Sequence, residues 1–127
     1  FQQLAIVKML AHNLFPQIKI VGCETVREKT GLAMSSRNKR LSDDEKKAAS
    51  FLYEILMKAR SLKNSNSVHE IKNWARKEFS ENKNFKLEYF EIVDKNSLKK
   101  LDEWNDNEIA CTAAFIGGVR LIDNISL

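Results

Sequence analysis

The amino-acid sequence predicts an α+β fold, in which helices pack over a small, mainly antiparallel sheet. Two stretches with helical spacing of apolar residues occupy the middle of the chain, and each opens with a Ser-x-x-Glu capping box. Two apolar runs joined by Gly117-Gly118 then predict a β-hairpin. With 127 residues, 43% of them hydrophobic, the chain has the size and composition to bury the core of one domain.

The N-terminal segment predicts one helix and one strand. Apolar residues recur with helical spacing between residues 2 and 15, and Pro16 ends the pattern. This stripe comprises Leu4, Val7, Ala11 and Leu14. The following Ile18–Cys23, "IKIVGC", is short and rich in β-branched residues, which favours a strand. Residues 24–39 show no steady period and predict a loop.

Two capping boxes mark the starts of the next two helices. Ser42 with Glu45, and Ser67 with Glu70, have the spacing at which each side chain caps the other residue's backbone N–H. The first helix carries the apolar stripe Ala48, Leu52, Ile55, Ala59 and Leu62, and the second carries Val68, Ile71, Ala75 and Phe79. The polar residues 61–67, "SLKNSNS", predict the linker between them.

The remaining sequence predicts the sheet. Phe85–Val93 begins with alternating apolar and polar residues and ends with an apolar run, as expected for a partly buried strand. Ile109–Ile116 is an apolar strand, and Val119–Ile122 is its hairpin partner, because the two intervening glycines tolerate the positive φ angles of a primed turn. Asn96–Leu101 is expected to form at most a short helix.

Charge and cysteine content narrow the class of protein. The formal net charge of +4 suits an anionic partner, but bases and acids are interspersed as on an ordinary solvated surface. Cys23 and Cys111 lie in apolar stretches outside any CxxC pair, so we expect buried free thiols in a reducing compartment. No apolar run approaches the roughly eighteen residues of a membrane span, and Phe1–Phe15 lacks a signal-peptide cleavage site. We therefore expect a cytoplasmic protein without membrane attachment.

The stretch "GLAMSSRNKRLSDDEKK", residues 31–47, is the strongest candidate for a binding site. Ser35 and Ser36 offer hydroxyl donors, and Arg37 offers a planar cationic fork that matches phosphate oxygens. Arg27 adds a second cation upstream, and the helix that follows presents N–H groups that favour anions. On composition alone, a flexible basic surface loop explains the same residues.

Three segments also carry a family resemblance. They are "FQQLAIVKML" at residues 1–10, "TVREKTGLAMSSRNKRLS" at 25–42 and "RLIDN" at 120–124. In this order they resemble the C-terminal part of the pantothenate synthetase (pantoate–β-alanine ligase) family, and the similarity covers essentially the whole chain. Because the sequence also begins without Met, we expect it to be a piece of a longer enzyme.

The resemblance implies an ATP-dependent, AMP-forming ligase. The carboxylate of pantoate attacks the α-phosphorus of ATP, which is accompanied by Mg²⁺, and gives pantoyl adenylate and pyrophosphate; the amine of β-alanine then expels AMP. The resemblance also implies a homodimer, in which a Rossmann-like nucleotide-binding domain precedes a smaller lid domain. Residues 1–25 would be the last helix and strand of the first domain, and residues 26–127 the complete lid.

Single residues receive binding roles from the same resemblance. Gln3 matches the pantoate-binding glutamine, and Val26 matches a position whose backbone meets the adenine. The ATP-binding set is completed by Met34, Ser35, Ser36 and Arg37, the last three on the triphosphate. Arg27 and Asn38 lie in the motif without a direct ligand, and we expect them to order the loop.

The sequence departs from the family in what it lacks. The family's HxGH motif, which supplies a catalytic histidine, is absent, and both His12 and His69 fit ordinary helix positions. The Gly-x-Lys-Asp segment that precedes "FQQ" in the family is absent as well. The resemblance therefore assigns no catalytic residue and no metal ligand to this chain, and we expect the chain alone to be inactive.

Two other classes of function stay open at the level of sequence. A small basic nucleic-acid-binding module fits the "SSRNKR" cluster and predicts a steep loss of affinity with salt, although the chain lacks the aromatic pattern of single-strand binders. A purely structural interaction domain would leave Ser35, Ser36 and Arg37 without a role. We expect ATP, pantoate and β-alanine as partners, rather than nucleic acid.

Overall fold

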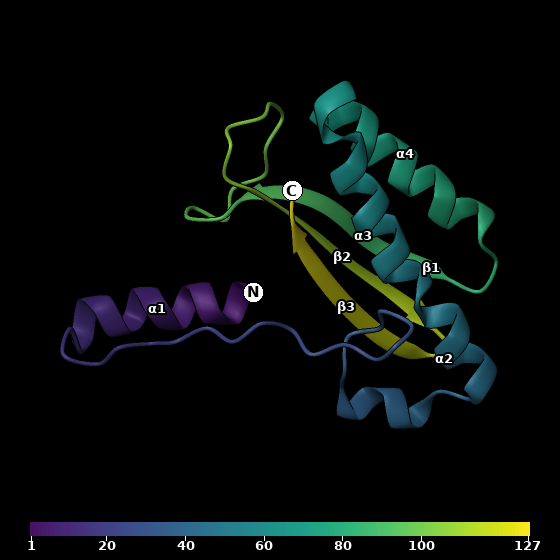
Figure 1. Ribbon diagram of the computed structural model, residues 1–127, viewed down its shortest axis with the longest axis horizontal. Helices are drawn as coiled ribbons and strands as arrows, with labels where there is room; N and C mark the ends of the chain where they lie inside the picture. Colours follow the sequence, from purple (N-terminus) through teal and green to yellow (C-terminus); the bar gives the residue numbers. More distant parts are fainter.

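Two helices cover one face of a three-stranded sheet in the computed structural model, which describes residues 1–127 (Figure 1). The strands β1 (Lys86–Asp94), β2 (Glu108–Ile116) and β3 (Val119–Ser126) pair antiparallel in the order β1-β2-β3. Helix α4 (Val68–Glu81) lies against β1, and helix α3 (Phe51–Leu62) lies against β2 and β3. The predicted α+β fold is confirmed.

Both predicted capping boxes form. The Ser42 hydroxyl accepts a hydrogen bond from the Glu45 N–H at 3.2 Å, and the Glu45 carboxylate accepts one from the Ser42 N–H at 2.7 Å. Ser67 and Glu70 make the same exchange at the start of α4. These local bonds satisfy N–H groups that have no partner within the helix, which is why the two starts lie where the sequence places them.

The first predicted helix is divided in two. Helix α2 (Asp43–Ala49) ends at Ser50, and α3 begins at the next residue. The Ser50 hydroxyl lies 2.9 Å from the Lys47 carbonyl oxygen and 2.7 Å from a Glu54 carboxylate oxygen, and its one hydrogen can be donated to either acceptor. Such side-chain bonds compete with the regular helical pattern and account for the break.

The core lies between the helices and the inner face of the sheet. Strand β2 is central and buried along nearly its whole length. The rings of Phe51, Phe79 and Phe85 contact one another at centroid distances of 5.2, 5.5 and 5.9 Å, an arrangement that stabilises the end of α4 against the start of β1. Both predicted helical stripes contribute to this core, with Leu52 and Ile71 almost fully buried.

The hairpin between β2 and β3 forms around Gly117 and Gly118, which have φ angles of +53° and +75°. Strand β3 is longer than predicted, because β2 offers pairing partners beyond Ile122 as far as the pair Ile109–Ser126. The sequence alone does not show this extension, since polar residues interrupt the apolar run of β3.

The segment between β1 and β2 contains no helix, so the short helix considered for Asn96–Leu101 does not form. The Asp94 carboxylate accepts hydrogen bonds from the Ser97 N–H at 2.7 Å and from the Ser97 hydroxyl at 2.8 Å, which holds a turn instead. Further along, the buried Glu108 carboxylate pairs with Lys63 at 2.7 Å. Lys63 lies in the short 3₁₀ helix η2 (Lys63–Ser65), so this pair ties the predicted linker to β2.

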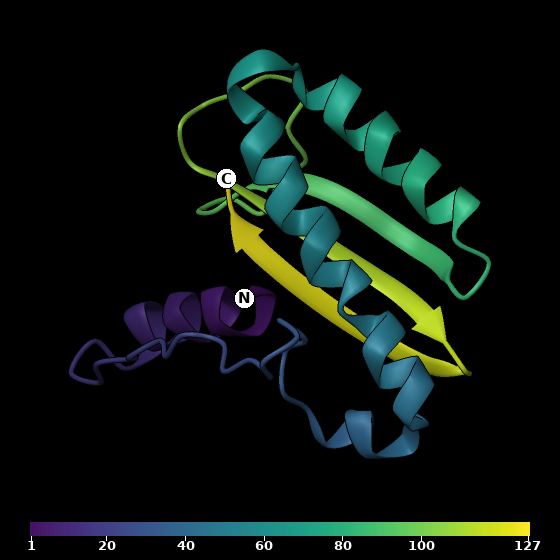
Figure 2. The same ribbon diagram turned by 45° about the vertical axis from the view of Figure 1, so that its right-hand side comes forward.

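The N-terminal segment extends away from α3 and α4 (Figures 1 and 2). Helix α1 (Gln2–Leu14) forms as predicted, but of its apolar stripe only Ala11 is buried, and Leu14 is 64% exposed. Ile18–Cys23 is not a strand, contrary to the prediction, because no strand of the chain pairs with it. For the same reason Cys23 is exposed rather than buried, whereas Cys111 is buried as expected; both thiols are free. The domain boundary after residue 25 stays a prediction.

None of the helices combines the length and apolar character that crossing a membrane requires.

Candidate functional site

Residues 26–34 form a tight backbone hairpin where the sequence predicted an irregular loop. Arg27 and Ala33 form an antiparallel bridge, and the Met34 N–H donates to the Val26 carbonyl at 2.9 Å. Gly31 has a φ of +89°, which glycine adopts without strain, and it lies directly against the ring of Tyr53. The hairpin therefore places Val26 and Met34, two residues of the expected ATP-binding set, beside each other.

The end of this hairpin is open. The Val26 N–H and the Met34 carbonyl have no hydrogen-bond partner, although the two residues face each other across the hairpin. Their side chains are 68% and 61% exposed. A free donor and a free acceptor next to two exposed apolar side chains can receive the polar edge and the flat face of an aromatic heterocycle.

A five-residue 3₁₀ helix, η1 (Ser36–Arg40), follows the hairpin at once. Its N-cap is Ser35, whose hydroxyl oxygen accepts a hydrogen bond from the Arg37 N–H at 3.2 Å. The Arg37 N–H is therefore not free to bind an anion. The basic side chains of η1 take part in no ion pair; they are Arg37, Lys39 and Arg40.

Met34, Ser35 and Arg37 line one side of a cleft of about 230 Å³. The other side comes from β3, whose Arg120 and Asp123 also line it. Arg120 is bound by the Glu88 carboxylate at 2.6 and 3.2 Å, and Asp123 is bound by Arg27 at 2.6 and 2.9 Å. The cleft therefore presents one charged group without a partner, the Arg37 guanidinium.

Asn38 fixes η1 to the hairpin. It is 5% exposed, and its side-chain amide donates to the Ala33 carbonyl at 3.0 Å and to the Glu28 carboxylate at 3.3 Å. We expected Arg27 and Asn38 to order the loop without a ligand, and both side chains are committed to bonds within the protein.

The structure brings together most of the predicted site residues, with one exception. Met34, Ser35 and Arg37 share the cleft, Val26 adjoins Met34, and Ser36 is exposed beside them. Gln3 lies on α1, exposed and without a side-chain hydrogen bond, and does not line this cleft. A joint site for Gln3 and the 34–37 segment does not form within these 127 residues.

Sequence reasoning missed the wall that β3 contributes. Arg120, Asp123 and Asn124 belong to the segment "RLIDN", which carried part of the resemblance but received no role. The only available signal was two charged residues in an otherwise apolar strand. Such residues need partners when they are buried, and Asp123 is 6% exposed.

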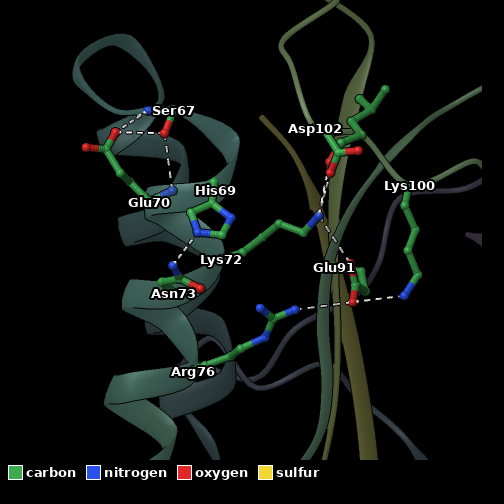
Figure 3. Close-up of polar contacts among 10 residues, drawn as sticks. Ser67, His69, Glu70, Lys72, Asn73, Arg76, Glu91, Lys100 and Asp102 are labelled. Carbon is green, nitrogen blue, oxygen red and sulfur yellow. Dashed lines mark hydrogen bonds and ion pairs between the residues drawn. The ribbon is translucent and has the colours of Figure 1, made fainter.

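A second cluster of charged groups lies between α4 and β1 (Figure 3). The Glu91 carboxylate contacts Lys72 at 3.5 Å, Arg76 at 3.4 Å and Lys100 at 3.1 Å. Burial alone would raise the pKa of Glu91, but the hydrogen bond from Lys100 and the charges of Lys72 and Lys100 hold it below its ordinary value. These cations are bound by a carboxylate of the protein, so the cluster is a structural feature and a poor candidate for an anion site.

No group of three or more His, Cys, Asp or Glu side chains is arranged to hold a metal ion. His69 bonds to Asn73 on the same helix, and His12 lies exposed on α1. Neither histidine lines the cleft.

Comparison with known proteins identifies relatives of the whole chain. The family model described as pantoate-beta-alanine ligase matches residues 1–126. The pantothenate synthetase of Christiangramia forsetii is 45% identical over 100% of this chain, and that of Bacteroides thetaiotaomicron is 43% identical over 98%. The chain covers 46% and 45% of those two proteins, so it spans less than half of their length.

Solved structures agree with these relatives. The pantothenate synthetase of Thermus thermophilus superposes with a TM-score of 0.90 at 34% identity, over 98% of this chain and 45% of that one. The pantoate-beta-alanine ligase of Francisella tularensis, solved as a complex with beta-gamma ATP and beta-alanine, superposes with a TM-score of 0.63 at 33% identity, over 98% of this chain and 39% of that one.

Proposed function

This chain belongs to the pantoate-beta-alanine ligase family, and from that premise we propose that it supplies the ATP-binding loop of a ligase that joins pantoate to β-alanine. The observation that carries the proposal is the Arg37 guanidinium, the one unpaired charged group of a cleft whose other charges are all neutralised. An unpaired arginine fork beside serine hydroxyls has the geometry and charge to bind phosphate oxygens.

The reaction proposed for the whole enzyme has two steps. A carboxylate oxygen of pantoate bonds to the α-phosphorus of ATP, and the bond to the bridging oxygen breaks and releases pyrophosphate. The amine of β-alanine then bonds to the acyl carbon of the adenylate, loses a proton, and expels AMP. We place Mg²⁺ with ATP as part of the substrate, as the family resemblance implies.

In the first step, negative charge accumulates on the departing pyrophosphate. Arg37, with the Ser35 and Ser36 hydroxyls as donors, would stabilise that charge more strongly in the transition state than in bound ATP. The free Val26 N–H and Met34 carbonyl would receive the adenine edge, so that base and phosphates are held by neighbouring parts of one loop. The adenine assignment is further supported by the exposed apolar side chains of these two residues.

The proposal includes a division of labour within the longer enzyme. Gln3 does not line the cleft in this chain, so we propose that it meets pantoate only where the remainder of the enzyme completes a second wall. The exposed apolar face of α1 is consistent with such a contact. The 127 residues alone would then bind ATP no better than about millimolar and would not catalyse the reaction. A homodimer and a cytoplasmic location belong to the same proposal.

The experiment compares pyrophosphate release by this 127-residue chain and by the longest natural form of the protein that contains it. Each is given Mg-ATP, pantoate and β-alanine, and each is assayed again with pantoate omitted. We expect release by the longer form to require pantoate, and no turnover by the chain alone. Turnover of the chain at the rate of the longer form would show that our division of labour is wrong. Tighter binding of a mixed oligonucleotide than of ATP would instead favour the nucleic-acid-binding alternative.

A further inference from the structure

The Arg27 side chain makes four hydrogen bonds, more than any other side chain of the loop. It does not line the cleft that contains Arg37. Its guanidinium donates to both carboxylate oxygens of Asp123, at 2.6 and 2.9 Å. It also donates to the Gly31 carbonyl at 3.0 Å and to the Asn124 carbonyl at 3.4 Å. The charged carbon lies 4.1 Å from the centroid of the Tyr53 ring. We call this set of contacts the Arg27 clamp.

The clamp joins three elements that are distant in sequence. Arg27 and Gly31 belong to the hairpin, Tyr53 to α3, and Asp123 to β3. The Arg27 and Asp123 side chains are 19% and 4% exposed, so their attraction is only weakly screened by water. The clamp thus fixes the hairpin to the rigid part of the domain.

The clamp also sets the position of the residues that follow. Asn38 ties η1 back to the hairpin at the Ala33 carbonyl, so the segment from Met34 to Arg37 is held at both ends. Arg37 itself has no partner that would orient it. Its position relative to the cleft depends on the backbone that carries it, and that backbone depends on the clamp.

We infer that Arg27, acting through Asp123, is a positioning residue that fixes the loop, and with it Arg37, relative to the β3 wall of the cleft. This inference rests on the proposed function of the loop. Arg27 touches no substrate in this account, since four of its hydrogen bonds and its ring contact lie within the protein. Errors of about 1 Å in such placement can cost about a hundredfold in rate.

The test measures dissociation constants for ATP and for AMP in the longest natural form of the protein. Loss of placement weakens the contacts to the β- and γ-phosphates, which AMP lacks, so the preference for ATP over AMP should shrink. We expect Arg27→Lys to reduce that preference about tenfold, because an ammonium group cannot replace the bidentate fork. Asp123→Asn should reduce it by a similar factor, and the double variant should lose no more than the worse single variant.

The ratio of the two constants separates positioning from simple loss of folded protein, because an unfolded fraction lowers the binding capacity without changing either constant. Arg76→Lys is the matched control, since it makes the same substitution in an arginine–carboxylate pair on α4, away from the cleft. It should leave the preference unchanged. Arg37→Ala is the positive control and should also reduce the preference.

Each result decides the matter. A reduced preference in both single variants, without further loss in the double variant, supports the inference. An effect of Arg27→Lys but none of Asp123→Asn would overturn it, because Arg27 would then act on the ligand itself. No effect of either variant, while Arg37→Ala reduces the preference, would overturn the clamp and leave the proposed function intact. No effect of Arg37→Ala would overturn the proposed function and the inference with it.

Discussion

The two basic clusters of this molecule have similar composition and opposite character. On η1, Arg37, Lys39 and Arg40 are exposed and make no ion pair. Between α4 and β1, three basic side chains surround the Glu91 carboxylate, and Lys72 among them is buried (Figure 3). The first cluster has charge available for a ligand, whereas the charge of the second is used to hold a helix against a strand.

The difference teaches that a count of basic residues does not locate an anion site. What matters is whether a carboxylate of the protein already lies among the cations. The net charge of +4 belongs to the whole chain, and of the two clusters only the η1 cluster is free to exchange water for phosphate oxygens. Substitutions in the two clusters should therefore affect different properties.

The largest effect should follow from Arg37→Ala in the longest natural form of the protein. We expect the rate of pyrophosphate release to fall by about ten- to a thousandfold, the scale of losing one donor to the transition state. The free energy of unfolding should change by less than about 0.5 kcal/mol, because the side chain is exposed and unpaired. A timed assay of pyrophosphate release measures the rate, and chemical denaturation measures the free energy of unfolding. Normal pyrophosphate release with a large loss of stability would contradict the prediction, because Arg37 would then act in folding rather than in binding.

Glu91→Gln should have the opposite profile. It leaves Lys72 buried with only Asp102, 3.9 Å away and almost fully exposed, as an acidic neighbour. We expect a loss of about 2 to 3 kcal/mol in the free energy of unfolding, somewhat below the usual cost of breaking a buried pair because some water reaches both groups. Binding of ATP should not change. Urea denaturation measures the loss, and Glu81→Gln, in an exposed pair with Lys77, is the matched control that should cost under about 0.5 kcal/mol.

The smallest expected effect is a change in the free energy of unfolding as the pH is lowered. The pKa of Glu91 in the folded protein lies below its ordinary value of 4.5, so the unfolded state binds the extra proton first. The stabilisation from this carboxylate is therefore complete above pH 4.5 and is lost as the pH falls through the folded pKa. The stability difference between the natural protein and Glu91→Gln should shrink as the pH is lowered from about 6 to below about 4.5. A difference that stays constant over that range would show that the ion pairs do not depend on the Glu91 charge.

Local patterns predicted the elements that rest on local bonds. The capping boxes at Ser42 and Ser67 form within four residues of chain, and the Gly117-Gly118 turn needs only its own backbone freedom. The break at Ser50 is local too, but it depends on a side-chain rotamer that apolar spacing does not reveal.

Two features that need a distant partner were predicted wrongly or not at all. Ile18–Cys23 has the composition of a strand, but a strand requires a neighbour, and none of β1, β2 and β3 provides one. In the candidate site, the family motif led to Arg37 and to the adjoining serines, whereas the partner of Arg27 lies 96 residues away on β3. Pairing over such a distance leaves no mark on local spacing.

That separation of 96 residues also bears on how the protein is made. A ribosome adds about 5 to 20 residues per second, so Asp123 is added roughly 5 to 20 s after Arg27. Until Asp123 has been added, the hairpin lacks its anchor on β3, and the segment from Met34 to Arg37 is not tied to the rest of the domain through Arg27. A nascent chain, or a product of synthesis that stops before β3, would carry every residue of the proposed ATP-binding loop and still lack the anchor that fixes this loop to the domain.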